Sequence, residues 1–198
     1  MKAAADVMEP SEKGQLKVEF SVGKGLYCSP RGRLKITEAF VDRVKTRMHQ
    51  LAAQRLPFAK KAWPTDEAIR LFSHQDMKDK VQLFRYRRGS YINVYSLDGY
   101  YDYNYGYMVP DTGYLNYFDV IPYQKGLMLM LPSAAEPERV PVFEERKKLF
   151  GTLSESTAWG ERIGIDAVGH LNDKICEGDL TELILLQEAL QEGRIGVI

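Results

Sequence analysis

The sequence has few cysteines, no net charge and no long apolar run, and each of these absences excludes a class of protein. Its two cysteines, Cys28 and Cys176, lie far apart and outside any CxxC or CxxH pattern. This spacing indicates reduced thiols rather than a disulfide framework or a zinc site. Lysine plus arginine equals aspartate plus glutamate, at 27 each, so the chain as a whole has no charge excess that would favour nucleic acid or an anionic membrane.

Membrane insertion and secretion are not expected either. No stretch approaches the roughly eighteen consecutive apolar residues of a spanning helix. The start of the chain, MKAAADVMEPSEKGQ, lacks the apolar core of a signal peptide. We therefore expect a cytoplasmic protein without a membrane partner, and its 198 residues, 44% of them hydrophobic, are enough for a sizeable core.

Motifs of catalysis are also missing. A phosphate-binding loop needs GxxxxGK[ST]. SVGKGLYCS contains a Gly-Lys pair, but Val18 stands five residues before Gly23, where the first glycine of the motif would be. The three histidines are isolated from one another, so we expect no metal site. Cys28 would need a neighbouring base to act as a nucleophile, and a buried small hydrophobic residue is the favoured interpretation. We predict no catalytic residue, no metal and no cofactor in this chain.

The first half of the sequence alternates between strand and helix patterns. Apolar residues alternate over residues 16–27 around two glycines, which predicts a β-hairpin. A helix with apolar residues at helical spacing is predicted over 38–54, with Thr37 as its N-cap. An extended segment closed by Pro64 precedes a helix or helix pair, for which Thr65 is the predicted cap.

The second half divides at a change of composition. Residues 91–131 are rich in β-branched and aromatic side chains and predict three or four antiparallel strands. The segment PSAAEPERVP, residues 132–141, is proline-rich and is the predicted linker. It separates an α+β domain over 1–131, with helices packed on an antiparallel sheet, from an all-helical C-terminal extension over 142–198. Glycines end the predicted helices of the extension, at Gly164, Gly178 and Gly193.

Two segments carry side chains suited to binding. In DGYYDYNYGYMVPDTGYLNYF, strand alternation places four tyrosines, from Tyr101 to Tyr107, on one face, where we expect them to form core. The opposite face carries Asp102, Asn104 and Gly106, which offer hydrogen bonds and close backbone access. The basic segment RYRRGSY, residues 85–91, is typical of a nucleotide or single-strand binder, or of an edge strand protected by charge, and the edge strand is favoured.

Two family resemblances cover nearly the whole chain from Leu16. DGYYDYNYGYMVPDTGYL, preceded by LPFAKKAWPTDEAIRLF, resembles the second additional domain of threonyl-tRNA synthetases, where such segments form an editing site. Three other segments resemble the bacterial uridine kinase or nucleoside kinase family, which carries a synthetase-like region ahead of its phosphotransferase domain. They are VEFSVGKGLYC, GLMLMLP and above all LSESTAWGERIGIDAVGHLNDKICEGDLTELILLQEALQEGRI. This second resemblance implies a downstream kinase domain as partner, with ATP or GTP and Mg²⁺ used there.

The resemblance also implies a remodelled pocket. The synthetase loop supplies a cysteine and a histidine, whereas this sequence has Asn104 and Met108 at the matching positions. A ligand is expected on the side of Asp102, Asn104 and Met108, near the Gly23–Gly25 turn. There Lys24 and Arg85 would supply positive charge to a phosphate or carboxylate.

Three functions follow from these observations. The favoured one is a non-catalytic accessory region of a nucleoside kinase that binds a nucleoside, a nucleotide or a tRNA end. The alternatives are a tRNA-editing-type hydrolase or RNA-binding module, and a structural region that forms a homodimer through its C-terminal helices.

Overall fold

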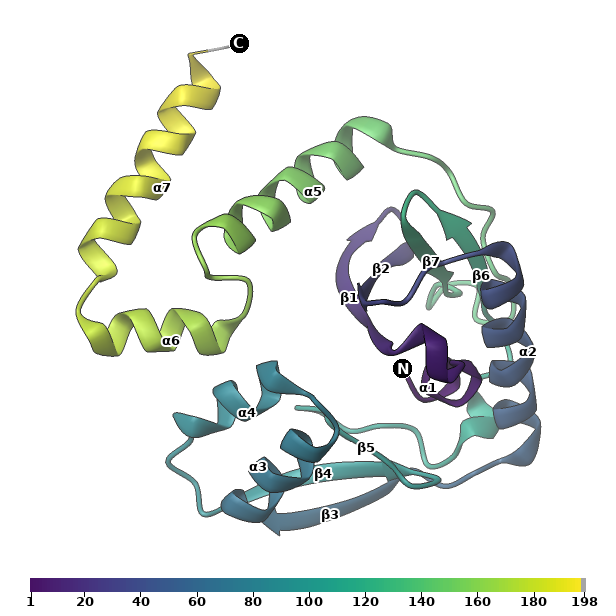
Figure 1. The fold of residues 1–198 in the computed structure, drawn as a ribbon. Coiled ribbons are helices and arrows are strands. Elements are labelled where there is room, and N and C mark those ends of the chain that lie inside the picture. Colours follow the sequence, from purple (N-terminus) through teal and green to yellow (C-terminus); the bar gives the residue numbers. More distant parts are fainter. Residues whose placement is uncertain (197–198) are drawn as a thin grey trace. The chain divides into compact units, whose positions relative to one another are not determined.

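The computed structural model describes residues 1–196, and the chain forms two compact units (Figure 1). The first unit joins residues 1–61 to residues 93–157, and the second joins residues 62–92 to the chain from Ala158 onward. The described residues form seven α-helices and two sheets, and the elements after the last strand are all helices. This confirms the α+β class with a C-terminal helical stretch.

A four-stranded antiparallel sheet is the centre of the first unit. The predicted hairpin is confirmed, with a turn at Gly23, whose φ of 61° suits glycine. Its second strand pairs with a strand far along the chain, with Cys28 opposite Leu127. The order is β1-β2-β7-β6, formed by β1 (Gly14–Val22), β2 (Gly25–Gly32), β7 (Gly126–Met130) and β6 (Asp119–Tyr123).

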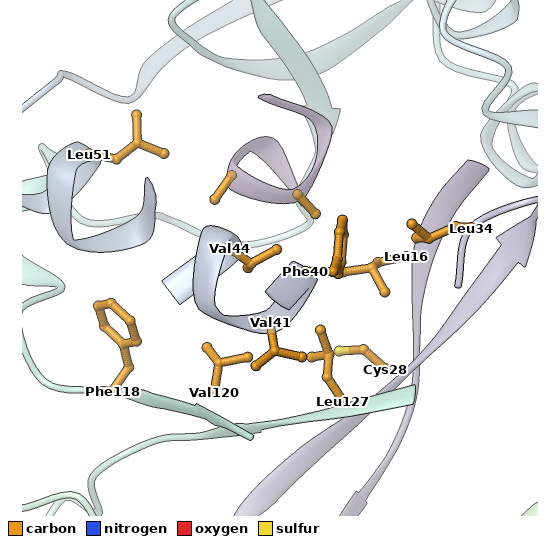
Figure 2. Close-up of a cluster of buried hydrophobic side chains, with 12 residues drawn as sticks. Leu16, Cys28, Leu34, Phe40, Val41, Val44, Leu51, Phe118, Val120 and Leu127 are labelled. Carbon is orange, nitrogen blue, oxygen red and sulfur yellow. The ribbon is translucent and has the colours of Figure 1, made fainter. Parts of the chain in front are cut away.

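Helix α2 (Glu38–Gln54) packs on one face of this sheet, together with the short α1 (Lys2–Val7). Thr37 is its N-cap as predicted, because the Thr37 hydroxyl accepts the Phe40 N–H at 3.2 Å. Figure 2 shows the buried cluster that results, with side chains from the helix facing side chains from the strands. Its labelled members are Leu16, Cys28, Leu34, Phe40, Val41, Val44, Leu51, Phe118, Val120 and Leu127.

The opposite face of the sheet is covered as well. Tyr27 and Met128 alternate with Cys28 and Leu127, so they point to the other side. Side chains from the end of the predicted linker and from the chain after it pack on them, namely Val140, Phe143, Phe150 and Leu153. The rings of Tyr27 and Phe150 meet edge to face with centroids 4.9 Å apart. The start of the helical extension therefore shares the core of the sheet, and the domain boundary at residues 132–141 stays a prediction.

A second sheet has three strands in the order β3-β4-β5, formed by β3 (Ala59–Pro64), β4 (Tyr91–Leu97) and β5 (Tyr100–Tyr103). Strands β4 and β5 are antiparallel and are joined by the turn at Asp98 and Gly99, both with positive φ. Residues 91–131 thus contain four strands, within the predicted number. They are shared between two sheets rather than placed in one.

The second unit is mainly helical. Helices α3 and α4 bring the rings of Phe72 and Phe84 together, with centroids 5.6 Å apart. Helix α4 also approaches α6 closely, because a Cβ at Gly169 would lie 2.8 Å from the Gln82 Cβ. None of the helices within residues 1–196 is long and apolar enough to cross a membrane. The bounds are α3 (Thr65–His74), α4 (Lys78–Arg85), α6 (Val168–Glu177) and α7 (Leu180–Ile195), while α5 (Lys147–Arg162) begins in the first unit.

Two local predictions about helix ends are wrong. Thr65 is the first residue of α3 rather than its cap, and its hydroxyl donates to the Gly89 carbonyl at 2.6 Å. Gly193 does not end α7, which continues to Ile195. Gly178 does end α6, with a φ of 89° in the left-handed region.

The contact between α4 and α6 should make stability depend on pH at its alkaline limit. The Tyr86 hydroxyl donates a hydrogen bond to the Asp173 carboxylate, and this hydrogen bond raises the pKa of Tyr86 to about 12. A phenol whose folded pKa is raised stabilises the fold at pH values below its ordinary pKa of 10.0, and this contribution is lost as pH rises from 10.0 towards about 12. We expect Tyr86→Phe to remove this part of the alkaline dependence. Urea denaturation at a series of pH values measures it, and an unchanged profile in the variant would contradict the assignment.

Candidate functional site

A cavity of about 340 Å³ lies within the first unit, among α2, the β1–β2 hairpin, β4, β5 and the loop that follows β5. Its lining is mainly apolar. Helix α2 supplies Met48 and Ala52 to the wall, and the hairpin supplies Val18 and Cys28. Val18 is 50% exposed, so the cavity reaches the surface beside the hairpin.

Aromatic rings form much of the remaining wall and are held in place. Tyr95 is buried, and its hydroxyl donates to the Gly106 carbonyl at 2.9 Å. Phe118 stacks on His49 with ring centroids 4.5 Å apart. Phe58 and Tyr100 line the cavity too. Rings fixed in this way offer flat apolar surfaces to a ligand.

A few polar groups face the same space. Thr112 is 3% exposed and fully engaged, because its hydroxyl donates to the Leu51 carbonyl at 2.5 Å and accepts the Leu56 N–H at 2.9 Å. Asp102 accepts the Tyr103 N–H at 2.7 Å. A mainly apolar cavity with a few polar groups is the usual composition of a small-molecule site.

The thiol of Cys28 is a poor nucleophile in this setting. Its side chain is buried, and the loss of water around it raises the pKa of the Cys28 thiol. Because the thiolate is the reactive form, the thiol is inert at neutral pH. This supports the interpretation of Cys28 as a buried small hydrophobic residue. In the described part of the chain, no three side chains of His, Cys, Asp or Glu lie close enough to hold a metal ion.

The five predicted ligand-binding residues are distributed over the structure. Asp102 and Met108 line the cavity together, and Asn104 lies exposed in the loop between them. Lys24 lies at the tip of the hairpin, in a separate depression. Arg85 ends α4 in the second unit, 4.0 Å from Asp173. Their roles in binding remain predictions.

The expected face of four core tyrosines is wrong. Strand β5 ends at Tyr103, so the alternation does not continue into the following loop. Tyr105 and Tyr107 are 92% and 93% exposed instead. The Lys60 ammonium lies 4.5 Å from the centre of the Tyr107 ring, within the range of a cation–π contact.

Sequence reasoning missed the aromatic wall of the cavity. Phe58, Tyr95 and Phe118 come from three separate segments and carry no local motif. These segments are far apart in the sequence and meet only in the folded first unit.

Comparison with known proteins gives one informative similarity. No family model matches the chain. A threonine–tRNA ligase from Methylococcus capsulatus is 29% identical over 151 residues, which are 76% of this chain and 22% of that protein. The chain thus spans about a fifth of the length of this relative. The similarity fits the predicted synthetase-like domain and does not bear on the kinase resemblance.

Proposed function

We propose that this chain is a synthetase-like accessory region whose cavity binds a nucleoside, a nucleotide or the acceptor end of a tRNA. The cavity of about 340 Å³ in the first unit is the observation that carries this proposal. Its volume lies near the lower end of the range of about 300–1,000 Å³ for ligand sites, which suits one small ligand. The similarity to a threonine–tRNA ligase supports a tRNA end as one source of that ligand.

The ring surfaces favour a nucleobase over an aliphatic ligand. Phe58, Tyr95 and Phe118 all line the cavity. Stacking of a base on an aromatic side chain contributes about 1–3 kcal/mol and tolerates any base. The site therefore selects for a flat ring and only weakly among bases.

Exposed aromatic and basic groups beside the cavity favour a longer ligand. Tyr107 is exposed next to Met108, which lines the cavity, and Lys60 lies over the Tyr107 ring. Tyr114 and Tyr117 are also exposed, at 65% and 46%. Rings combined with a cation are typical of surfaces that bind single-stranded nucleic acid. This supports the tRNA end as a ligand.

The chemistry of the site argues against an editing-type hydrolase. Asn104 and Met108 stand where the synthetase resemblance implies a cysteine and a histidine. Cys28 has a raised pKa and is buried. Binding without reaction is therefore the proposed role.

We propose further that the region belongs to a nucleoside kinase, with ATP or GTP and Mg²⁺ used by a downstream kinase domain. This part rests on the resemblance of residues 153–195 and on the synthetase-like region expected ahead of such a domain. A GxxxxGK[ST] motif after a β-strand in the downstream coding sequence would support it, and its absence would contradict it.

A structural role in a homodimer is the second candidate function. Helix α7 exposes several large apolar side chains, among them Ile184, Leu185 and Ile195 at 50%, 60% and 71%. Such side chains at a helix surface favour contact with a partner. The molar mass of the chain in solution tests this role.

We expect the isolated chain not to phosphorylate uridine with ATP or GTP. It has no phosphate-binding loop, so nothing in it would hold the transferred phosphate by backbone N–H groups. Formation of uridine monophosphate measures the activity. The expectation would be contradicted if uridine phosphorylation co-purified with this polypeptide through a second purification.

Ligand binding tests the cavity directly. Uridine, ATP and a tRNA acceptor-stem mimic are titrated into the chain and into Val18→Trp, which places a large ring at the exposed rim of the cavity. We expect saturable binding of at least one ligand and about tenfold weaker binding in the variant, which corresponds to about 1.4 kcal/mol.

Val168→Trp is the matched control, because Val168 is 62% exposed and does not line the cavity. Its affinity should equal that of the unmodified chain. Absence of binding for all three ligands, or equal affinities in Val18→Trp and the unmodified chain, would refute the proposal.

A further inference from the structure

A second hollow of about 280 Å³ lies at the tip of the β1–β2 hairpin. One wall comes from the hairpin and the end of β7, and the other from the segment that precedes α5. Val22, Met130 and Phe143 give it an apolar floor, and the first two are only 1% and 2% exposed. All of its lining residues belong to the first unit.

The segment that forms the outer wall is held at several points. Phe143 packs edge to face on Tyr123, with ring centroids 4.9 Å apart. Val140 packs with it on the buried cluster of Val22 and Met130. Earlier in the same segment, the Glu136 N–H donates to the Ser133 carbonyl at 3.1 Å. The hollow is therefore bounded by anchored chain on both sides.

The rim carries an excess of positive charge. Arg139 pairs with Glu136 at 3.4 Å, and both side chains are more than half exposed. Arg146 pairs with Glu144 at 3.8 Å, again near the surface. Exposed ion pairs of this kind contribute little to stability, so a bound anion can replace the carboxylate partner at low cost.

Lys24 supplies the positive charge that is not balanced by a carboxylate on the rim. It has no hydrogen bond or ion pair within the described part of the chain and lines the hollow. Arg146 lies against the same turn, because a Cβ at Gly23 would be 3.7 Å from the Arg146 Nε. The rim thus carries the Lys24 ammonium, which comes from the turn itself, and the Arg146 guanidinium, which lies beside the turn.

We propose that this hollow binds a small organic anion, a phosphate monoester or a carboxylate attached to a compact apolar group. Lys24 and Arg146 contact the anion, and the apolar group rests on Val22, Met130 and Phe143. The volume lies just under the range of about 300–1,000 Å³ for ligand sites, so the ligand is small. This site is separate from the cavity of the proposed function and gives Lys24 the anion-binding role predicted from the sequence, at a different place.

Phenyl phosphate is the probe, because it joins a phosphate to a compact ring. Its binding is followed by chemical shift changes in ¹H–¹⁵N spectra of the chain. We expect saturation with shifts at Gly23, Lys24 and Arg146, and about tenfold weaker binding in Lys24→Gln and Arg146→Gln. Benzoate should bind at the same residues, and inorganic phosphate and benzyl alcohol should each bind more weakly than phenyl phosphate.

Lys125→Gln is the matched control, because Lys125 is an exposed lysine in the turn between β6 and β7 and does not line the hollow. It should leave the affinity unchanged. Equal weakening in Lys125→Gln and Lys24→Gln would show general charge attraction and overturn the proposal. So would benzyl alcohol binding as tightly as phenyl phosphate, or no saturation.

The two sites can be tested independently. Val18→Trp should keep its affinity for phenyl phosphate, and Lys24→Gln should keep its affinity for the nucleoside ligands. Loss of phenyl phosphate binding in Val18→Trp would place the probe in the larger cavity and overturn the assignment to the hairpin tip.

Discussion

Phe40→Ala is expected to lower the free energy of unfolding by about 3–5 kcal/mol, the usual range for removing a buried phenylalanine ring. Phe40 is 0% exposed and lies where α2 meets the four-stranded sheet (Figure 2). Its neighbours come from the helix and from strands, so they cannot close around the gap without moving the helix. Urea denaturation followed by far-ultraviolet circular dichroism measures the change.

Tyr105→Ala is the control for this substitution. It also removes an aromatic ring, but from a side chain that is 92% exposed. We expect a change within about 0.5 kcal/mol, as for most surface substitutions. Equal losses in the two variants would mean that Phe40 is not at the centre of the core.

Gly126→Ala should be strongly destabilising, although it adds only a methyl group. A Cβ at this position would lie 2.2 Å from the Cys28 carbonyl oxygen and 2.9 Å from the Tyr27 ring. The first of these atoms is backbone of the paired strand and cannot move aside alone. We expect a loss of about 2–3 kcal/mol from this overpacking, measured by the same denaturation experiment.

Gly151→Ala makes the same chemical change with the opposite expected sign. Gly151 lies inside α5, and nothing stands within 4 Å of its added Cβ. Alanine should stabilise the helix by about 0.5–1 kcal/mol, because it loses less backbone freedom on folding. Destabilisation by both substitutions, or by neither, would contradict the packing at Gly126.

The sequence predicted elements whose cause is local. Thr37 predicts the start of α2, because a hydroxyl just before an apolar helical pattern accepts a free N–H of the first turn. Gly178 ends α6 because glycine takes the left-handed conformation without strain. Gly193 shows the limit of this signal, since the same residue type is tolerated inside α7.

The missed features depend on distant segments. Phe143 and Phe150 follow a proline-rich stretch and read as part of a separate extension, yet they pack on Tyr123 and Tyr27. Strand propensity suggested that the tyrosine run continues to Tyr107, but the chain leaves β5 after Tyr103. Side-chain pattern alone cannot report which segments meet in space.

The candidate site shows the same division. Asp102 and Met108 were predicted together and line one cavity, because they flank a single short loop. Lys24 lies in a different hollow, whose other wall is the segment before α5. Nothing in the residues around Lys24 indicates that segment.

The pairing of β2 with β7 has a consequence for synthesis on the ribosome. Cys28 pairs with Leu127, so the sheet stays incomplete while residues 29–126 are translated. At about 5–20 residues per second this takes roughly 5–20 seconds. During that interval the nascent hairpin and α2 lack Val120 and Leu127 as packing partners. The apolar face of α2 is then accessible to chaperones, and slower translation of this stretch prolongs its exposure.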